Sequence, residues 1–215
     1  MRLLIWAVFI AGVVAAGVLG GKAGAFAYFV AILFVIAVFR RPLVLALTRL
    51  NSRLGLMRGT IKAMPAAINL TRASGPTDAA RPILAALAAS NFADAGAWNI
   101  AQMPQIQVSL MVQREEGMLA AVESASPIGA HVNVHTLYPD GRVATFTNSE
   151  LPMPPTARPN VERTQLPRCS PDALVVRARA DRPKIPFRPL TVEEAPRVYE
   201  RLYADEIRFR KAMGK

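Results

Sequence analysis

The chain lacks several features that define common protein classes. Its 215 residues include one cysteine, so no internal disulfide can form and a disulfide-stabilised scaffold is excluded. Charged residues make up only 19% of the sequence and hydrophobic residues 52%, a balance that excludes an intrinsically disordered chain. The two histidines and the single cysteine form no recognised metal-binding or nucleophile motif. The motifs therefore indicate no family, no cofactor and no metal site.

Acidic residues are absent from the first 77 positions. The first one is Asp78, and nine of the 26 basic residues precede it. The remaining 17 basic residues are nearly balanced by the 15 acidic ones. Because the basic excess lies beside long apolar runs, it predicts a belt that contacts anionic lipid headgroups, not a nucleic-acid-binding surface.

Two apolar runs without a charged residue occupy residues 3–21 and 23–39, on either side of Lys22. A helix crosses the hydrocarbon core of a bilayer with about 20 residues, and about 17 is the lower bound. The sequence therefore predicts a two-helix transmembrane hairpin over residues 1–41. A cleaved signal peptide is the alternative, but the first run is long for one and a second run follows directly.

Small residues recur at intervals of four in both predicted membrane helices. Such rows allow helix backbones to approach closely, either within one hairpin or between two copies of the chain. The residues expected to serve this helix packing are Gly12, Ala16, Gly20, Ala27 and Ala31.

The flanks of the hairpin predict its orientation. The first helix is preceded by Arg2 and the second is followed by Arg40 and Arg41, whereas the turn carries only Lys22. Because basic flanks remain in the cytoplasm, both termini and the domain after the hairpin are predicted to be cytoplasmic. The expected location is a bacterial inner membrane.

Residues 42–77 are predicted to form a basic amphipathic helix followed by a linker. Pro42 suits a first helical turn, and leucines then recur at spacings of three or four. Such a helix is expected to lie on the membrane surface, although it could instead pack its leucine face on the following domain. The residues expected at the membrane surface are Arg40, Arg41, Arg49, Arg53, Arg58 and Lys62.

The segment from residue 98 to 148 shows the period of two that is typical of strands. Predicted strands cover residues 105–113, 118–124, 130–138 and 142–148, with a shorter one at 98–102. Short turns join them, and Pro139-Asp140-Gly141 is a strong hairpin signal. The prediction is an antiparallel meander of four to five strands.

Helices are predicted on both sides of this meander. They cover residues 78–89, 172–181 and 192–213, and Thr191-Val192-Glu193-Glu194 fits a capping box for the last one. Ten of the 17 prolines fall between residues 151 and 199, and residues 151–169 are predicted to be an extended proline-rich excursion. Residues 78–215 are thus predicted to form an α+β domain with the helices on one face of the sheet.

Three polar residues share one side of the strand at 130–138, namely His131, Asn133 and His135. The two histidines stand about 13 Å apart at a rise of about 3.3 Å per residue, so they cannot share one metal ion. The first interpretation is a solvated polar face whose histidines contribute little to stability. The alternative is a ligand-contacting face, for which Glu123 on the neighbouring strand is a weak further candidate if it is buried.

Two functional hypotheses follow from these patterns. The first is a membrane-anchored binding or accessory module that docks a protein partner or a lipid headgroup. The second is a membrane-associated enzyme that acts on a lipid-linked or apolar substrate at the sheet face of His131 and His135. A concave site at this face with a buried carboxylate nearby would favour the enzyme, and a flat solvated face would favour the binding module.

Overall fold

The computed structural model describes residues 24, 26, 30, 63–126, 128–151 and 158–213. The chain divides into two compact units, Met1–Val44 and Leu45–Lys215, and the fold described here belongs to the second. The predicted membrane helices, their small-residue rows and the basic connector helix lie outside the described residues, apart from residues 24, 26 and 30. Within the described residues, no helix combines the length and apolar character needed to cross a membrane.

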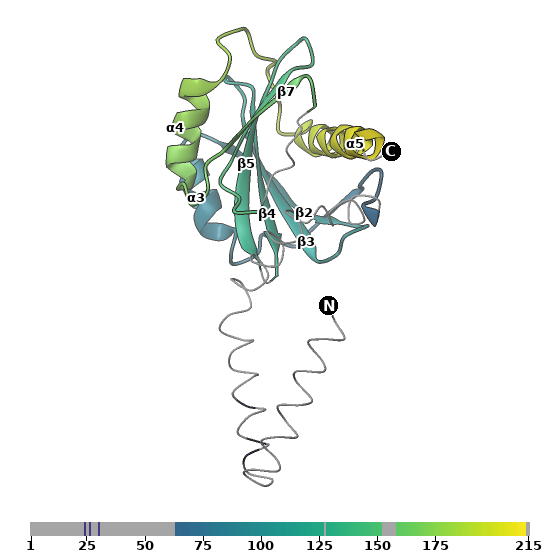
Figure 1. The fold of residues 1–215 in the computed structure, drawn as a ribbon. Helices are drawn as coiled ribbons and strands as arrows, with labels where there is room; N and C mark the ends of the chain where they lie inside the picture. Colours follow the sequence, from purple (N-terminus) through teal and green to yellow (C-terminus); the bar gives the residue numbers. More distant parts are fainter. Residues whose placement is uncertain are drawn as a thin grey trace. The chain divides into compact units, whose positions relative to one another are not determined.

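The second unit is an α+β domain built on one seven-stranded sheet (Figure 1). Strand order in the sheet follows the order along the chain, and all pairs are antiparallel except the last, which is parallel. The strands are β1 Leu70–Arg72, β2 Ala93–Ile100, β3 Ile106–Gln113, β4 Met118–Ala125, β5 Gly129–Leu137, β6 Val143–Thr147 and β7 Val161–Gln165.

The four central predicted strands are confirmed as β3 to β6, but the sheet is larger than predicted. The first two strands are β1 and a longer, earlier β2, and β7 lies inside the segment expected to be an extended excursion. Residues 161–165 contain a single large apolar residue, Val161, so their own pattern is weak. The segment becomes a strand because β6 offers its free edge, where Val143 to Thr147 pair in register with Val161 to Gln165.

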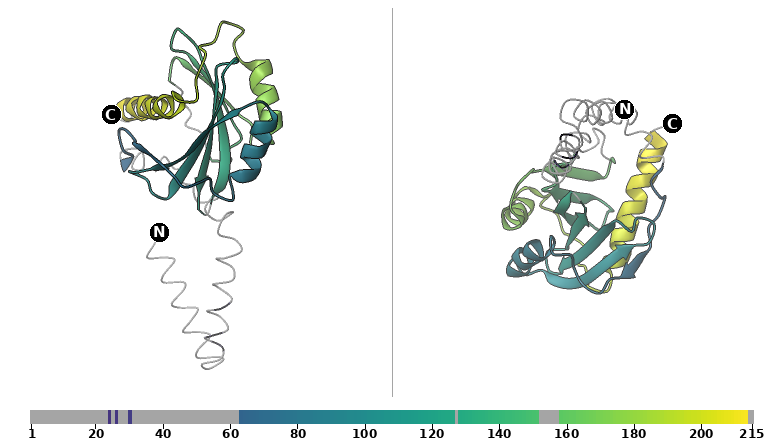
Figure 2. Two further views of the ribbon diagram at one scale, coloured as in Figure 1. Left: turned by 180° about the vertical axis from the view of Figure 1, so that it is seen from behind. Right: turned by 90° about the horizontal axis from the view of Figure 1, so that it is seen from below.

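Helices cover both faces of the sheet, which corrects the expectation that they share one face (Figures 1 and 2). On one face lie α3 Arg81–Ala89 and α4 Pro171–Asp181, and on the other lies α5 Ala195–Met213. The reason is that β4 is apolar at consecutive positions, so it buries both sides. Met118, Ala120 and Val122 pack towards α3 and α4, while Leu119 and Ala121 pack in the core that includes α5.

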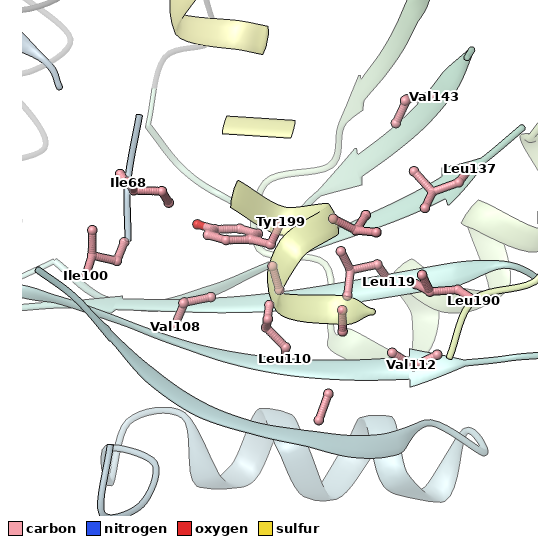
Figure 3. Close-up of a cluster of buried hydrophobic side chains, with 14 of the residues drawn as sticks. Ile68, Ile100, Val108, Leu110, Val112, Leu119, Leu137, Val143, Leu190 and Tyr199 are labelled. Carbon is pink, nitrogen blue, oxygen red and sulfur yellow. The ribbon is translucent and has the colours of Figure 1, made fainter. Parts of the chain in front are cut away.

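The core on the α5 face brings the helix against β3, β4 and β5. Val108, Leu110 and Leu119 are fully buried there, and Tyr199 of α5 lies among them (Figure 3). The predicted capping box begins this helix: Thr191 N–H donates to Glu194 Oε2 at 3.2 Å, and Glu194 N–H donates to Thr191 Oγ1 at 3.4 Å. This reciprocal pair satisfies backbone donors that have no partner within the helix and fixes where α5 leaves the loop.

Candidate functional site

The pairing register places the polar residues of four strands in adjacent rows on the α5 face. Glu123 of β4 is opposite His131 of β5, and in the next row Asn133 is opposite Thr147 of β6. A third row joins His135 to Thr145 and Thr145 to Arg163 of β7. Because side chains alternate along a strand, these residues all point to one side of the sheet.

Helix α5 supplies the opposite wall. Tyr199, Tyr203, Glu206 and Arg210 follow one another at intervals of four, three and four residues, which places them on one side of the helix. All four line a cavity of about 290 Å³ between the helix and the sheet. The face that carries the two histidines is therefore partly covered, in contrast to the fully solvated face first expected.

Glu123 is the centre of the polar contacts in this cavity. Its Oε1 accepts hydrogen bonds from Tyr199 Oη and Asn133 Nδ2, both at 2.9 Å. Its Oε2 lies 3.5 Å from Nε2 of His131. The side chains of His131 and Glu123 are only 20% and 28% exposed, so this contact is partly shielded from water.

These partners keep Glu123 ionised. Burial by itself would raise the pKa of the carboxyl group, because it disfavours the charged form. The hydrogen bond and charge of His131, together with the hydrogen bond of Tyr199, outweigh burial and lower this pKa below its ordinary value. The pKa of Tyr199 shifts upward instead. Burial and the neighbouring Glu123 carboxylate raise it well above 10, so the Tyr199 hydroxyl keeps its proton and remains a hydrogen-bond donor.

His135 is held in the neutral form. Burial lowers its pKa to about 4, and the positive charge of Arg163 acts in the same direction, against the opposing effect of Glu123. Its Nδ1 lies 3.0 Å from Thr145 Oγ1. At neutral pH His135 is therefore an uncharged hydrogen-bonding group between the carboxylate of Glu123 and the guanidinium of Arg163.

Arginines gather in the part of the cavity lined by β7 and the last turns of α5. Glu206 accepts hydrogen bonds from both Arg163 and Arg210. These bonds outweigh the effect of burial and lower the pKa of Glu206. Arg158 Nη1 lies 3.0 Å from Asp205 Oδ2, and all three arginine side chains are at most 21% exposed.

The rim of the cavity is fixed by Gln165 of β7. Its Nε2 donates to the carbonyl oxygens of Ser149 and Leu151, both at 2.7 Å. The hydroxyl groups nearby are engaged as well, since Thr147 Oγ1 accepts from Ser149 N–H at 3.1 Å and Ser149 Oγ accepts from Leu151 N–H at 3.2 Å. Neither of these two hydroxyl groups lies beside a histidine in these contacts, in contrast to Thr145 Oγ1, which contacts His135 Nδ1.

The structure brings together all the catalytic candidates that the sequence indicated. Glu123, His131, Asn133 and His135 line this one cavity. The other groups predicted from the sequence, at the membrane surface and in the membrane helices, lie outside the described residues.

Sequence reasoning missed the arginine side of the cavity. Arg163 lies in a strand that was not predicted. Glu206 and Arg210 follow Tyr199 and Tyr203 at helical spacing, and this regular spacing was the available signal. Arg158, which precedes β7, gave no local signal at all.

The cavity carries polar chemistry without a metal-binding constellation. In the parts of the chain that the structure describes, no three His, Cys, Asp or Glu side chains are close enough to hold a metal ion together. The chemistry available to the described side chains is proton transfer, hydrogen bonding and charge pairing.

Comparison of the chain with protein-family models, curated proteins and solved structures found no match to any of the three.

Proposed function

We propose that the chain is a membrane-anchored enzyme that performs general acid–base catalysis on an apolar or lipid-linked substrate in the cavity beneath α5. The observation that carries this proposal is the ionised Glu123 held against His131 inside a half-open cavity with polar and apolar walls. A carboxylate and a histidine in contact form a proton-transfer pair, since the carboxylate orients the imidazole and stabilises its charged form.

In this proposal each polar group has its own role. His131 accepts a proton from the substrate or from a water molecule, and Glu123 stabilises the imidazolium that forms. Tyr199 and Asn133 hold the Glu123 carboxylate in place through their hydrogen bonds. His135 remains neutral and offers a hydrogen bond to a polar substrate group, as a neutral imidazole can at a site of developing charge.

A binding module without turnover is the second candidate. The observation that favours it is that Glu123, Tyr199 and Asn133 satisfy one another, which leaves His131 and His135 as the groups facing a ligand. Both candidate functions include a membrane anchor, which is inferred from the two apolar runs of the sequence.

Solvent isotopes distinguish the two candidates whatever the chemical identity of the substrate. Full-length protein is incubated with a lipid and metabolite extract in water enriched in ²H and ¹⁸O, and the products are analysed by mass spectrometry. Proton transfer or hydrolysis introduces solvent isotopes into specific compounds, and we expect this labelling with the wild type and its loss in His131→Gln and Glu123→Gln.

Glu162→Gln is the matched control, because it changes an exposed glutamate on β7 at a position that alternates away from the cavity. Labelling should persist in this variant. Labelling that is equal in the wild type and both site variants, or absent in all of them, would contradict the enzymatic proposal.

A further inference from the structure

Positive charge exceeds negative charge at the end of the cavity that contains Arg163. Two carboxylates, Asp205 and Glu206, pair with four guanidinium groups near this end, of which that of Arg208 is 80% exposed and lies outside the cavity. Asp205 is shared by Arg158 at 3.0 Å and Arg208 at 3.6 Å, and Glu206 is shared by Arg163 and Arg210. Three of these arginines line the cavity and are largely buried. These three buried guanidinium groups share two carboxylates, and an anion would balance the remaining positive charge at this end of the cavity.

Arg158 also has an unused hydrogen-bond donor. Its Nη1 is engaged by Asp205, but its Nε is fully buried and finds no acceptor in the described part of the chain. A buried donor without a partner costs free energy, whereas a charge-assisted hydrogen bond from Nε to an anionic oxygen is among the stronger hydrogen bonds in proteins. Because Nε has almost no exposed surface, an anion reaches it only with a shift of the Arg158 side chain, and such an anion would satisfy both the donor and the excess charge.

Apolar side chains adjoin the arginines along the cavity. Val143 of β6 and Val161 of β7 form the row next to Thr145 and Arg163, and Leu202 and Ile207 face them from α5. A ligand that neutralises the arginines therefore also contacts a hydrocarbon surface. The cavity volume of about 290 Å³ is at the lower end of the range for small-molecule pockets, which limits the ligand to one short or partly inserted chain.

We infer that the cavity binds a single-chain amphiphile whose carboxylate or phosphate group contacts Arg158, with its hydrocarbon part against Val143, Val161 and Leu202. This inference rests on the proposed function in one respect: it names the substrate class of the same site. The anionic end is held by the arginines.

Binding is measured directly by isothermal titration calorimetry on the full-length protein in a mild non-ionic detergent. The probes are hexanoate, hexyl phosphate, hexanol and hexylammonium, whose short chains partition weakly into micelles. We expect hexanoate or hexyl phosphate to bind at least about tenfold more tightly than hexanol and hexylammonium, since an anionic oxygen forms a charge-assisted hydrogen bond with a guanidinium group, whereas hexanol is a neutral acceptor and hexylammonium accepts no hydrogen bond. The tighter of the two anions identifies the head group as carboxylate or phosphate.

Variants then assign the anion to Arg158. Arg158→Gln is expected to weaken binding of the preferred anion about tenfold, and Arg158→Lys less, because it keeps the charge but loses the planar donor geometry. Arg197→Gln removes the same charge from an exposed position on α5 and should leave binding unchanged. Equal losses in Arg158→Gln and Arg197→Gln would show that only the overall charge matters and would overturn the inference.

The probe series on the wild type decides the question even if Arg158→Gln does not fold. Equal or tighter binding of hexanol or hexylammonium overturns the inference. Anion binding that persists in His131→Gln, together with no isotope incorporation by the wild type, would support this inference and contradict the enzymatic proposal. Turnover of an uncharged compound that hexanoate and hexyl phosphate do not inhibit would do the reverse.

Discussion

Burial acts on Glu123 and His135 in the same physical sense, because it disfavours the charged form of each, yet the two groups end in different charge states. Glu123 has donors and a histidine close enough to outweigh burial, so its pKa falls and it stays charged. Burial of His135 lowers its pKa to about 4 against the opposing charge of Glu123, and Arg163 adds a smaller effect in the same direction as burial. Neighbouring groups outweigh burial at Glu123, whereas burial decides the charge state of His135.

Replacing Glu123 by Gln is expected to destabilise the domain at neutral pH and much less in acid. The lowered pKa of Glu123 stabilises the folded state above the ordinary pKa of about 4.5, and this contribution is lost as pH falls through the lowered value. At pH 7 the loss of its charged hydrogen bonds should cost about 1–3 kcal/mol in the free energy of unfolding. Denaturant titrations at pH 7 and pH 3 measure the difference, and an equal cost at both pH values would contradict it.

His135 is expected to make the domain less stable between pH 6.5 and about 4. Its lowered pKa means that the unfolded chain binds the proton in this interval and the folded chain does not, so stability falls as the pH falls. The slope from this one group is at most about 1.4 kcal/mol per pH unit. His135→Asn should flatten the profile in that interval, and an NMR titration of the wild-type imidazole should give a midpoint near pH 4. A midpoint near 6.5 would contradict the prediction.

At the scale of elements, the sheet and its connections fix the cavity walls. Gly117, in the turn between β3 and β4, has φ +58°, and a Cβ at this position would lie 2.5 Å from the carbonyl oxygen of Arg188. The segment that leads to α5 is thus packed against this turn, and Arg188 N–H donates to the carbonyl of Leu137 at 2.8 Å. These backbone contacts position the start of α5 relative to the sheet.

Gly117→Ala is therefore expected to destabilise the fold far more than Gly141→Ala. Both glycines have positive φ, which costs a non-glycine residue about 1–2 kcal/mol. Only Gly117 faces a backbone atom, whereas nothing lies within 4 Å of a Cβ at Gly141. The additional overpacking should cost about 1–3 kcal/mol more, measured by thermal or denaturant unfolding. Similar losses for both variants would show that the contact with residue 188 is easily relieved.

At the scale of the whole molecule, the described residues form two hydrophobic cores on opposite faces of one sheet. Leu87 of α3 belongs to one core and Leu119 of β4 to the other, and both are fully buried. The strands share both cores, because neighbouring residues of β4 contribute to opposite faces. Loss of packing on one face is thus transmitted through the sheet to the other.

This arrangement predicts that the domain unfolds in a single transition. Leu87→Ala and Leu119→Ala should each lower the free energy of unfolding by about 2–5 kcal/mol, since each leaves a cavity in a packed core. Far-ultraviolet circular dichroism and intrinsic fluorescence should give coincident unfolding curves for both variants. Val176→Ala, at a side chain that is 61% exposed, is the control and should have little effect. Two separated transitions would show that the faces unfold independently.

The membrane orientation is also a prediction at this scale. The basic flanks of the two apolar runs predict that the domain is cytoplasmic. Alkaline phosphatase fused after Lys215, which is active only in the periplasm, should be inactive, and a reporter active only in the cytoplasm should be active at the same position. The reverse pattern would overturn the orientation and favour a cleaved signal peptide.

The sequence by itself determined the elements whose residues carry their own pattern. Alternation predicts β3 to β6, and the box from Thr191 to Glu194 predicts the start of α5. Both signals are local, because one face of a strand or one turn of a helix lies within a few consecutive residues. The candidates Glu123, His131 and His135 were also visible, since they are polar residues on strands that the sequence predicts.

Only the tertiary structure decided how these elements enclose a cavity. Strand β7 forms because the free edge of β6 is available for pairing. Its Arg163 forms a hydrogen bond with Glu206, which lies 43 positions away in the sequence. Whether the face of His131 meets water or a helix depends on which side of the sheet α5 packs, and the two apolar faces of β4 permit either choice. The electrostatics of the cavity followed from that packing, because charge pairing and burial depend on distances in space that the order of residues does not specify.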